Sequence, residues 1–314
     1  MKRDVLDGWF VNSLPDMDQE DADVARYEIQ NALWWVGETG FDGIRQDTLP
    51  YVPRAFWRDW SAALHRQYPK LRAVGEVFDG DPAIPAFFQG TVDTVFDFPT
   101  YFNIRDVFAK GGAIDAAART LAKDRYYSNP DALVTFLGLH DVARFMNEPG
   151  VTTQNLKLAF TYLMTVRGTP MIYYGDEIAM PGGDDPDCRR DFPGGWREDT
   201  HNAFEESGRT PPEQDVFTHV QKLTALRQKL EALRRGKLVD IAVVGQTWVY
   251  ARQSPLGTAI VVLNNGTDAA EITVPFTDGN YAGQLGLGGD LKISGGNGTA
   301  RLPGHTGEIY FGGR

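Results

Sequence analysis

Residues 41–48 read FDGIRQDT, and the fold is best inferred by working outward from them. The run is predicted to be a short strand that ends beside the charged residue Asp47. A helix is predicted before it, over residues 20–36, and another after it, from Pro53 to about His65. A strand enclosed by two helices is typical of a parallel βα unit.

The same alternation continues through the first 235 residues or so. Further strands are predicted over residues 71–75, 91–96, 134–139 and 170–174. Further helices are predicted over residues 101–123, 154–166 and 214–235. Repeated strand–helix units predict an α/β fold with parallel strands.

The helix predicted over residues 20–36 begins with acidic residues, which the helix dipole favours in a first turn. An apolar face is the side of a helix that packs on a core. Much of that face is predicted to come from Val24, Tyr27, Ala32, Leu33 and Val36.

Composition changes after Gly236. Residues 238–312 are rich in Val, Ile, Thr and Gly, and apolar and polar residues alternate over 247–250. Turn-forming residues at 264–266 and 278–280 separate the extended runs. These patterns predict a small antiparallel β domain over 236–314, following an α/β domain over 1–235.

Charge and composition exclude several classes of partner. The formal net charge of −11 disfavours nucleic acid and anionic membranes, which are polyanions, whereas a neutral substrate suits it. No run approaches 18 consecutive apolar residues, so no membrane span is expected. Residues 1–5 lack the apolar region of a signal peptide, and a cytoplasmic location is the default expectation. Five scattered histidines show no metal-ligand spacing, so neither a metal nor a cofactor is predicted.

Three carboxylates stand out because each follows a predicted strand: Asp47, Glu76 and Asp141. Residues at the carboxyl ends of parallel barrel strands converge on one face, where active sites lie. Taken singly, each is as well explained as a solvated loop acid or a helix cap. Three such acids at successive strand ends, with Arg45 and His140 beside them, favour a catalytic site.

Four segments together resemble the conserved regions of the α-amylase superfamily, glycoside hydrolase family 13. Residues 41–48 resemble the second conserved region, 74–76 the third and 139–141 the fourth, and 168–177 is similar to the segment around the eighth barrel strand. The order and spacing agree with the family. The resemblance covers nearly the whole chain, including the closing β domain.

The resemblance implies a role for each residue of the set. Asp47 would be the nucleophile, and Arg45, on the same side of the strand, would keep it ionised. Glu76 would be the general acid and then the base, held protonated near neutral pH by burial and nearby carboxylates. Asp141, the third catalytic residue, would hold sugar hydroxyl groups and stabilise the oxocarbenium-like transition state. His140 would form a hydrogen bond with the sugar in the same subsite.

Residues 184–189, DDPDCR, resemble a motif of cyclomaltodextrinases and neopullulanases. The resemblance implies that Asp185 and Arg189 line the glycone side of the cleft. The alternative interpretation is a solvated surface loop, since such loops are commonly charged. Phe78 and Tyr51 are candidates for stacking on sugar rings, with core or wall packing as the alternative for each. Cys188 is expected to be a small packing residue, because no base lies near it in the sequence.

The chain departs from the family at its start. A complete (β/α)₈ barrel needs about 250 residues, and the first recognisable motif already matches the family's fourth strand. The resemblance therefore implies a partial (β/α)₈ TIM barrel, strands 4 to 8, followed by an antiparallel β-sandwich domain. The two end strands would be open edges, which a second copy or a complementary chain would cover.

The resemblance implies a retaining α-glucan hydrolase that cleaves α-1,4 and alternatively α-1,6 glucosidic bonds in maltooligosaccharides, cyclodextrins, starch or pullulan. Within enzymes the alternative is a glucan transglycosylase. The alternative from another class is a non-catalytic or partner-dependent truncated barrel that binds α-glucan or a complementary chain.

Overall fold

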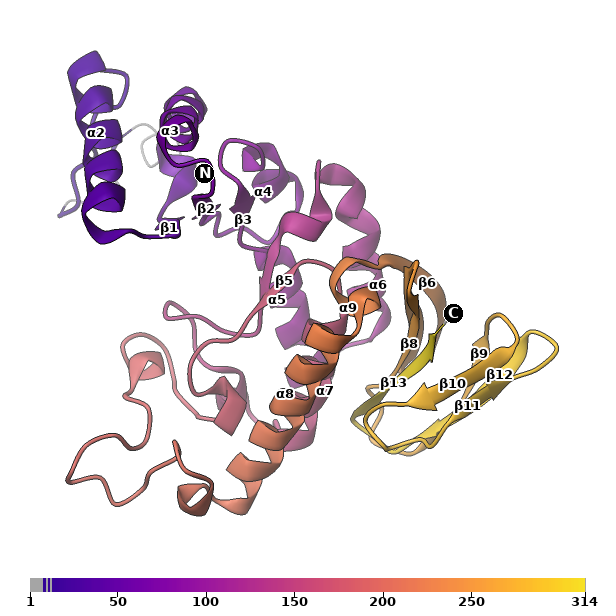
Figure 1. Ribbon diagram of the computed structural model, residues 1–314. Helices are drawn as coiled ribbons and strands as arrows, with labels where there is room; N and C mark the ends of the chain where they lie inside the picture. The colour runs from indigo at the N-terminus through magenta and orange to yellow at the C-terminus, as the bar shows by residue number, and fades with distance from the viewer. Residues whose placement is uncertain (1–7, 10, 12, 314) are drawn as a thin grey trace. The chain divides into compact units, whose positions relative to one another are not determined.

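The computed structural model describes residues 8, 9, 11 and 13–313 (Figure 1). It divides into two compact units. Unit 1 comprises the chain up to Pro99 together with Lys123–Val134, and unit 2 comprises Thr100–Ala122 together with the chain from Thr135 onward. The expectation that no signal peptide is present rests on residues 1–5, which lie outside the described residues.

Unit 1 is built on a parallel sheet of three strands in the order β1 (Gly43–Gln46), β2 (Arg72–Gly75) and β3 (Thr94–Val95). Arg45 lies opposite Val74, and Gln46 lies opposite Gly75. A parallel bridge between Phe96 and Val134 connects the end of β3 to β4 (Val134–Phe136). Because β1 and β2 run side by side in this register, the residues that follow them emerge next to each other.

Helices α2 (Ala22–Thr39), α3 (Arg54–Gln67) and α4 (Ala83–Phe88) complete unit 1. Their apolar sides pack with the strands around Trp57 and Trp60, which are almost fully buried. Asp21 accepts hydrogen bonds from the first amides of α2, and Gly40 ends the helix in a left-handed conformation. The prediction for Tyr27 is wrong, because its side chain is 60% exposed.

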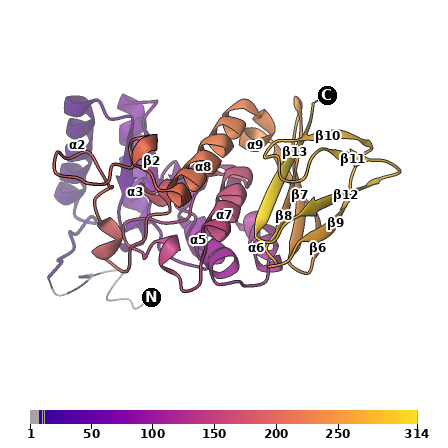
Figure 2. The same ribbon diagram turned by 90° about the horizontal axis from the view of Figure 1, so that it is seen from below.

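Unit 2 contains the remaining helices and the strand β5 (Thr169–Met171), which pairs with β4. In this unit α7 is buried along most of its length and packs beside α8 (Figure 2). The helices are α5 (Phe98–Ile104), α6 (Asp115–Leu121), α7 (Thr153–Thr165), α8 (Pro211–Lys229) and α9 (Glu231–Arg235), with a π-helical turn at Arg105–Ala109. Over both units, short 3₁₀ turns occur at Leu49–Tyr51, Ala122–Tyr126, Pro130–Ala132, Phe145–Asn147, Asp176–Ile178, Asp187–Arg189 and Glu206–Gly208.

Two of the predicted helices are interrupted. The helix predicted over 101–123 contains the π-helical turn and a break at Lys110–Ile114, where Gly111 has a left-handed conformation. The helix predicted over 214–235 divides at Leu230, whose backbone is extended (φ −94°, ψ 108°) while its side chain is buried in the core of unit 2. No helix among the described residues is long and apolar enough to cross a membrane.

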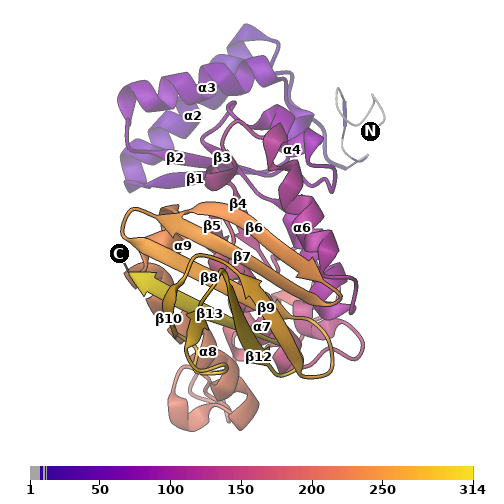
Figure 3. The same ribbon diagram turned by 90° about the vertical axis from the view of Figure 1, so that its right-hand side faces the viewer.

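The last third of unit 2 consists of antiparallel strands (Figure 3). Six strands form one sheet in the order β11-β10-β13-β8-β7-β6, and β12 pairs separately with β9. Side chains of both sheets share one apolar core. The strands are β6 (Lys237–Val244), β7 (Thr247–Ser254), β8 (Gly257–Asn264), β9 (Ala270–Pro275), β10 (Gly279–Gly283), β11 (Leu291–Ile293), β12 (Asn297–Leu302) and β13 (Thr306–Gly313).

A buried carboxyl group organises the loop after β10. Glu308, on β13, is fully buried. Its two oxygens accept hydrogen bonds from the backbone N–H groups of Gln284, Leu285, Leu287, Gly288 and Ile309. One side chain therefore satisfies these loop amides, and of them only that of Gln284 also donates to a strand, at the Ile309 carbonyl oxygen of β13.

Candidate active site

Asp47 and Glu76 meet on opposite sides of one guanidinium group in unit 1. Arg45 Nη1 lies 2.7 Å from Asp47 Oδ1, and Arg45 Nη2 lies 2.6 Å from Glu76 Oε1. The parallel register explains the meeting, because Arg45 is on β1 and Glu76 directly follows β2. The Glu76 side chain is only 8% exposed, whereas that of Asp47 is 61% exposed.

The turn after β1 fixes the position of Glu76. Thr48 adopts a left-handed conformation (φ 47°), which turns its backbone N–H toward Glu76 Oε2 at 3.3 Å. The next amide, of Leu49, donates to the carbonyl oxygen of Glu76 at 3.0 Å. A Cβ at Gly75 would lie 2.6 Å from Leu49 Cδ2, so a larger residue here would force the buried Leu49 side chain to shift.

The surroundings of Glu76 raise its pKa from 4.5 to about 7. Burial is the largest cause, because it disfavours the charged form, and a hydrogen bond with Asp47 acts in the same direction. The charge of Arg45 lowers the pKa but does not offset these two effects. Glu76 is therefore a carboxyl group that still holds its proton near neutral pH.

Tyr51 and Phe78 lie in the same unit. The pKa of the Tyr51 hydroxyl is raised, first by burial and then by the charge of Glu76, which indicates that this hydroxyl lies near the acid cluster. Phe78 packs its ring against that of the buried Phe98, with 4.3 Å between the centroids, and leaves 46% of its surface exposed. Phe78 thus offers an exposed aromatic surface two residues beyond Glu76.

In unit 2, His140, Asp141, Asp185 and Arg189 form a second cluster. Arg189 Nη2 lies 2.9 Å from Asp141 Oδ1, and Arg189 Nε lies 2.7 Å from Asp185 Oδ1. His140 Nε2 lies 3.1 Å from Asp141 Oδ2. All four side chains are partly exposed, so the cluster is accessible to a polar ligand.

A buried ion pair that the sequence reasoning missed supports this second cluster. Arg144 and Asp176 lie 3.2 Å apart and are almost completely buried. Arg144 also donates to the carbonyl oxygens of Tyr174 (2.7 Å) and Cys188 (3.0 Å), and its guanidinium lies over both the Tyr173 and Tyr174 rings. Cys188 is buried and donates its S–H to the carbonyl oxygen of His140 at 3.1 Å.

Arg144 therefore connects the two segments that carry the second cluster, its own and the one around Cys188, to a third segment at Tyr174 and Asp176. Burial raises the pKa of Asp176 to about 7 against the opposing effect of Arg144. Gly138 makes room for this pair, because a Cβ there would lie 3.1 Å from Asp176 Oδ2. The sequence held one signal for this ion pair. It has an arginine three residues after Asp141 and an acid near the end of the 168–177 segment.

The structure gathers the candidate residues into two clusters, one in each unit. Arg45, Asp47, Glu76 and Tyr51 belong to the first, and His140, Asp141, Asp185 and Arg189 to the second. In the described part of the chain, no group of three His, Cys, Asp or Glu side chains is arranged to hold a metal ion. The arrangement can supply a protonated acid, a neighbouring exposed carboxyl group and polar groups for hydroxyl binding.

Comparison with known proteins agrees with this chemistry. The family model for the catalytic domain of α-amylase matches residues 6–211. A cyclomaltodextrinase of Geobacillus thermopakistaniensis is 30% identical over 273 residues, which cover 85% of this chain and 44% of the relative. Neopullulanase 2 of Thermoactinomyces vulgaris is 32% identical over 246 residues, covering 77% of this chain and 39% of the relative. The chain thus spans less than half the length of these relatives.

Comparison with a solved structure also shows similarity to an α-amylase. The α-amylase of Geobacillus thermoleovorans in complex with acarbose superposes with a TM-score of 0.85 and 29% identity, over 96% of this chain and 66% of that one. The predicted resemblance is confirmed by the family model, which matches most of the chain, and by these neighbours. The chain therefore belongs to the α-amylase family of glycoside hydrolases.

Proposed function

We propose that this chain carries the catalytic acids of a retaining α-glucan hydrolase. Its substrates would be maltooligosaccharides, cyclodextrins, starch or pullulan, cleaved at α-1,4 and also α-1,6 glucosidic bonds. The observation that carries the proposal is the placement of Asp47 and Glu76 on one guanidinium, with the Glu76 pKa raised to about 7. Relatives named for cyclodextrin and pullulan substrates support the substrate class.

In the first step, Glu76 donates its proton to the glycosidic oxygen as the bond from that oxygen to the anomeric carbon breaks. A carboxylate oxygen of Asp47 attacks the same carbon from the opposite face and forms a covalent glycosyl ester. A raised pKa suits Glu76 to this task, because the acid still holds its proton near neutral pH.

In the second step, Glu76, now ionised, removes a proton from a water molecule. That water attacks the anomeric carbon, the bond to Asp47 breaks, and the sugar leaves with its original configuration. Retention needs about 5 Å between the two carboxyl groups. The hydrogen bond that joins Asp47 and Glu76 must therefore open when a sugar enters.

Asp141 and His140 are proposed to bind sugar hydroxyl groups, with Asp185 and Arg189 on the glycone side. Arg189 fits this role because it contacts Asp141 and Asp185 together, which fixes the direction of both carboxylates. Phe78 and Tyr51 are proposed to contact the faces of sugar rings.

We further propose that β1 to β5 correspond to strands 4 to 8 of an eight-stranded barrel. The barrel portion would be residues 1–235, and the closing β domain would be residues 236–314. The order β1-β2-β3, the bridge from β3 to β4 and the pairing of β4 with β5 support the correspondence.

The test is hydrolysis of β-cyclodextrin, starch and pullulan by the purified 314-residue chain, with proton NMR to follow the anomer released. Asp47→Ala and Glu76→Gln are expected to lower turnover by at least about 10³-fold, since each removes a group that reacts directly. Asp42→Asn is the matched control, because Asp42 is exposed and lies at the opposite end of β1.

Activity close to that of the unaltered chain in either acid variant would refute the assignment, and release of the β-anomer would refute retention. Formation of longer oligosaccharides in place of reducing sugar would favour transglycosylation on the same residues.

A further inference from the structure

The π-helical turn over Arg105–Ala109 directly follows α5 in unit 2. The bond that defines it joins the Lys110 N–H to the Arg105 carbonyl oxygen, five residues earlier, at 3.0 Å. A buried amide from a distant segment holds the turn, because Asn265, just after β8, donates to the Val107 carbonyl oxygen at 3.1 Å. Such turns often occur at functional sites, so the side chain at its start is a candidate for a functional role.

The Arg105 side chain points into unit 2, where only 10% of it is exposed. Its guanidinium donates through Nη1 to the Ala143 carbonyl oxygen and through Nη2 to Glu148 Oε1. Nη1 also donates to the hydroxyl of Tyr101, on α5, at 3.3 Å. One buried cation therefore ties both ends of the segment 143–148 to the helix that precedes the π-helical turn.

The segment that Arg105 holds begins two residues after Asp141. The carbonyl oxygen of His140, just before Asp141, accepts a hydrogen bond from Arg189 Nε at 2.9 Å. The carbonyl oxygen of Ala143, just beyond it, accepts from Arg105. Two arginines thus fix the backbone on either side of Asp141, and the backbone conformation limits the directions that its side chain can take.

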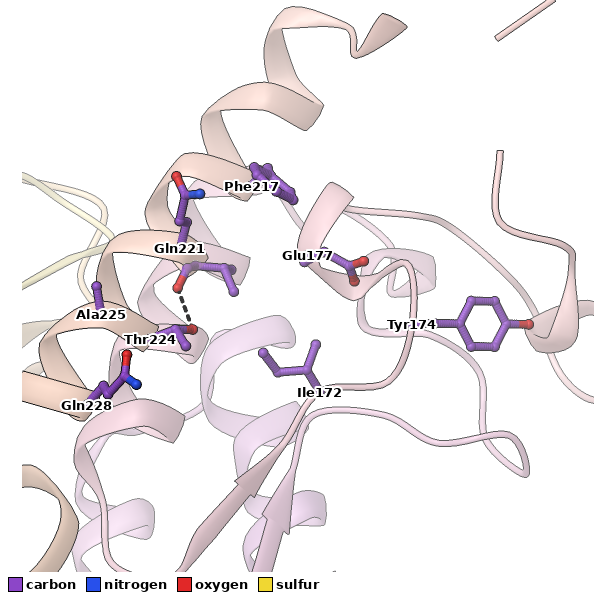
Figure 4. Close-up of a pocket in the computed structure, with 9 residues that line it drawn as sticks. Ile172, Tyr174, Glu177, Phe217, Gln221, Thr224, Ala225 and Gln228 are labelled. Atoms are coloured by element: carbon purple, nitrogen blue, oxygen red, sulfur yellow. Dashed lines mark hydrogen bonds between the residues drawn. The ribbon is translucent and has the colours of Figure 1, made fainter. Parts of the chain in front are cut away.

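The other segment of the second cluster is held by different groups. The Tyr174 hydroxyl donates to the Arg190 carbonyl oxygen at 2.8 Å. Tyr174 lines a groove together with one side of α8, and Figure 4 shows its ring pointing away from that helix. Loss of Arg105 should therefore disturb the segment that carries His140 and Asp141 and leave the other segment in place.

We propose that Arg105 is a positioning residue of the second cluster. By holding the Ala143 carbonyl group and the Glu148 carboxylate, it fixes the directions in which His140 and Asp141 meet a ligand. A buried ion pair is a poor device for stability alone, because the cost of removing both charges from water offsets most of their attraction. The inference rests on the proposed sugar-binding role of the cluster, and Arg105 acts on that role through the backbone.

The test is NMR of the His140 ring in the full chain, because this measurement needs neither substrate nor turnover. The resonances are assigned by their loss in His140→Gln. Arg105→Met should shift them, because His140 Nε2 lies 3.1 Å from Asp141 Oδ2 and the ring senses any change in that contact. Arg105→Lys should shift them less, since lysine keeps the charge but not the two-sided contact of a guanidinium.

Arg227→Met is the matched control. Arg227 is also buried in unit 2, and it donates to the carbonyl oxygens of Met164 and Gly168, which lie outside the second cluster. Both methionine variants should lose stability in urea unfolding. Only Arg105→Met should shift the His140 resonances, which separates a positional role from a general loss of stability.

Calorimetry with maltotriose then measures what the geometry does for binding. Arg105→Met should raise the Kd about tenfold or more, because a small misplacement of binding groups is costly. A resonance shift with no loss of affinity, or with no binding even by the native chain, would uphold the positional role of Arg105. It would refute the sugar-binding role proposed for the second cluster.

Two results would overturn the proposal. The first is an unchanged set of His140 resonances in Arg105→Met, or in Arg105→Lys if the methionine variant does not fold. The second is an equal shift in Arg227→Met, which would show that the loss of any buried arginine loosens unit 2.

Discussion

Arg45 contacts two carboxyl groups that must be in opposite protonation states for the proposed reaction. Both contacts are short, at 2.7 Å to Asp47 and 2.6 Å to Glu76, yet only Glu76 is withdrawn from water. Removing a charged carboxylate from water costs free energy. The attraction to a guanidinium that two carboxyl groups share does not offset this cost. The difference in exposure therefore separates the acid from the nucleophile.

Arg45→Gln is expected to raise the pKa of Glu76 above about 7, because the charge of Arg45 lowers it in the native chain. The alkaline limb of the pH–rate profile should move to higher pH, while turnover falls by about 10²-fold or more through loss of the bridge. Carbon-13 NMR titration of Glu76 measures the shift without activity. Arg72→Gln, a change of an exposed arginine at the start of β2, is the control. An unchanged or lower Glu76 pKa in Arg45→Gln would contradict the electrostatic account.

Arg144→Met should cost about 3–5 kcal/mol of unfolding free energy, the usual cost of removing one partner from a buried pair. It also removes the hydrogen bonds that hold the carbonyl groups of Tyr174 and Cys188. Urea unfolding measures the loss. Arg301→Met, which breaks the exposed pair with Glu271, should cost less than about 1 kcal/mol. Equal costs for the two variants would show that the buried pair has no special role.

At the level of elements, the strand–helix alternation could be predicted because hydrophobic periodicity is a local property. Tyr27 could not be placed, because an aromatic residue on an amphipathic helix gives the same sequence pattern whether its side chain is buried in the core or exposed. The break at Leu230 depends on the core of unit 2, which no local pattern describes.

The candidate acids were found through their strand-end positions, since register places such residues together. Arg144 and Asp176 were missed, because their pairing joins segments about 30 residues apart and can be seen only once the chain has folded.

Gly75→Ala tests how tightly the first strands and their turn fit. The added methyl would lie 2.6 Å from Leu49 and 3.1 Å from Val92, so strain of about 1–3 kcal/mol is expected, with displacement of the adjacent Glu76. Thermal unfolding and a crystal structure of the variant measure the two effects. Gly279→Ala is the control, because its nearest neighbour would lie at an ordinary 3.4 Å. A variant as stable as the native chain would mean that Leu49 moves freely.

For the whole molecule, the two carboxyl pKa values that are raised to about 7 predict how stability changes with pH. Glu76 and Asp176 titrate near pH 7 when folded but near 4.5 and 3.8 when unfolded. Between pH 6.5 and 8 the folded chain therefore holds more protons than the unfolded chain, and its unfolding free energy should fall as pH rises. His219, whose pKa burial lowers from 6.5 to about 4, acts in the opposite direction, mainly below pH 6.5, and its effect fades across the lower end of this window.

Urea midpoints at pH 6.5, 7.2 and 8 measure the slope. The double variant Glu76→Gln, Asp176→Asn should show a flatter dependence, and Asp42→Asn should keep the native slope. A native midpoint that rises across this range would contradict the assignment of raised pKa values to these two groups.

The buried carboxyl group of Glu308 should slow the exchange of amide hydrogens in the loop after β10. Beyond Gln284, whose N–H also donates to the Ile309 carbonyl oxygen of β13, the loop after β10 has no strand pairing among the described residues. An unpaired loop normally exchanges its amide hydrogens with solvent within seconds. Here the amides of Leu285 and Leu287 donate to a fully buried carboxyl group, so they should exchange as slowly as those of β13. Glu308→Gln should release them together, and deuterium uptake over residues 284–288 would record that one side chain governs the opening of the loop.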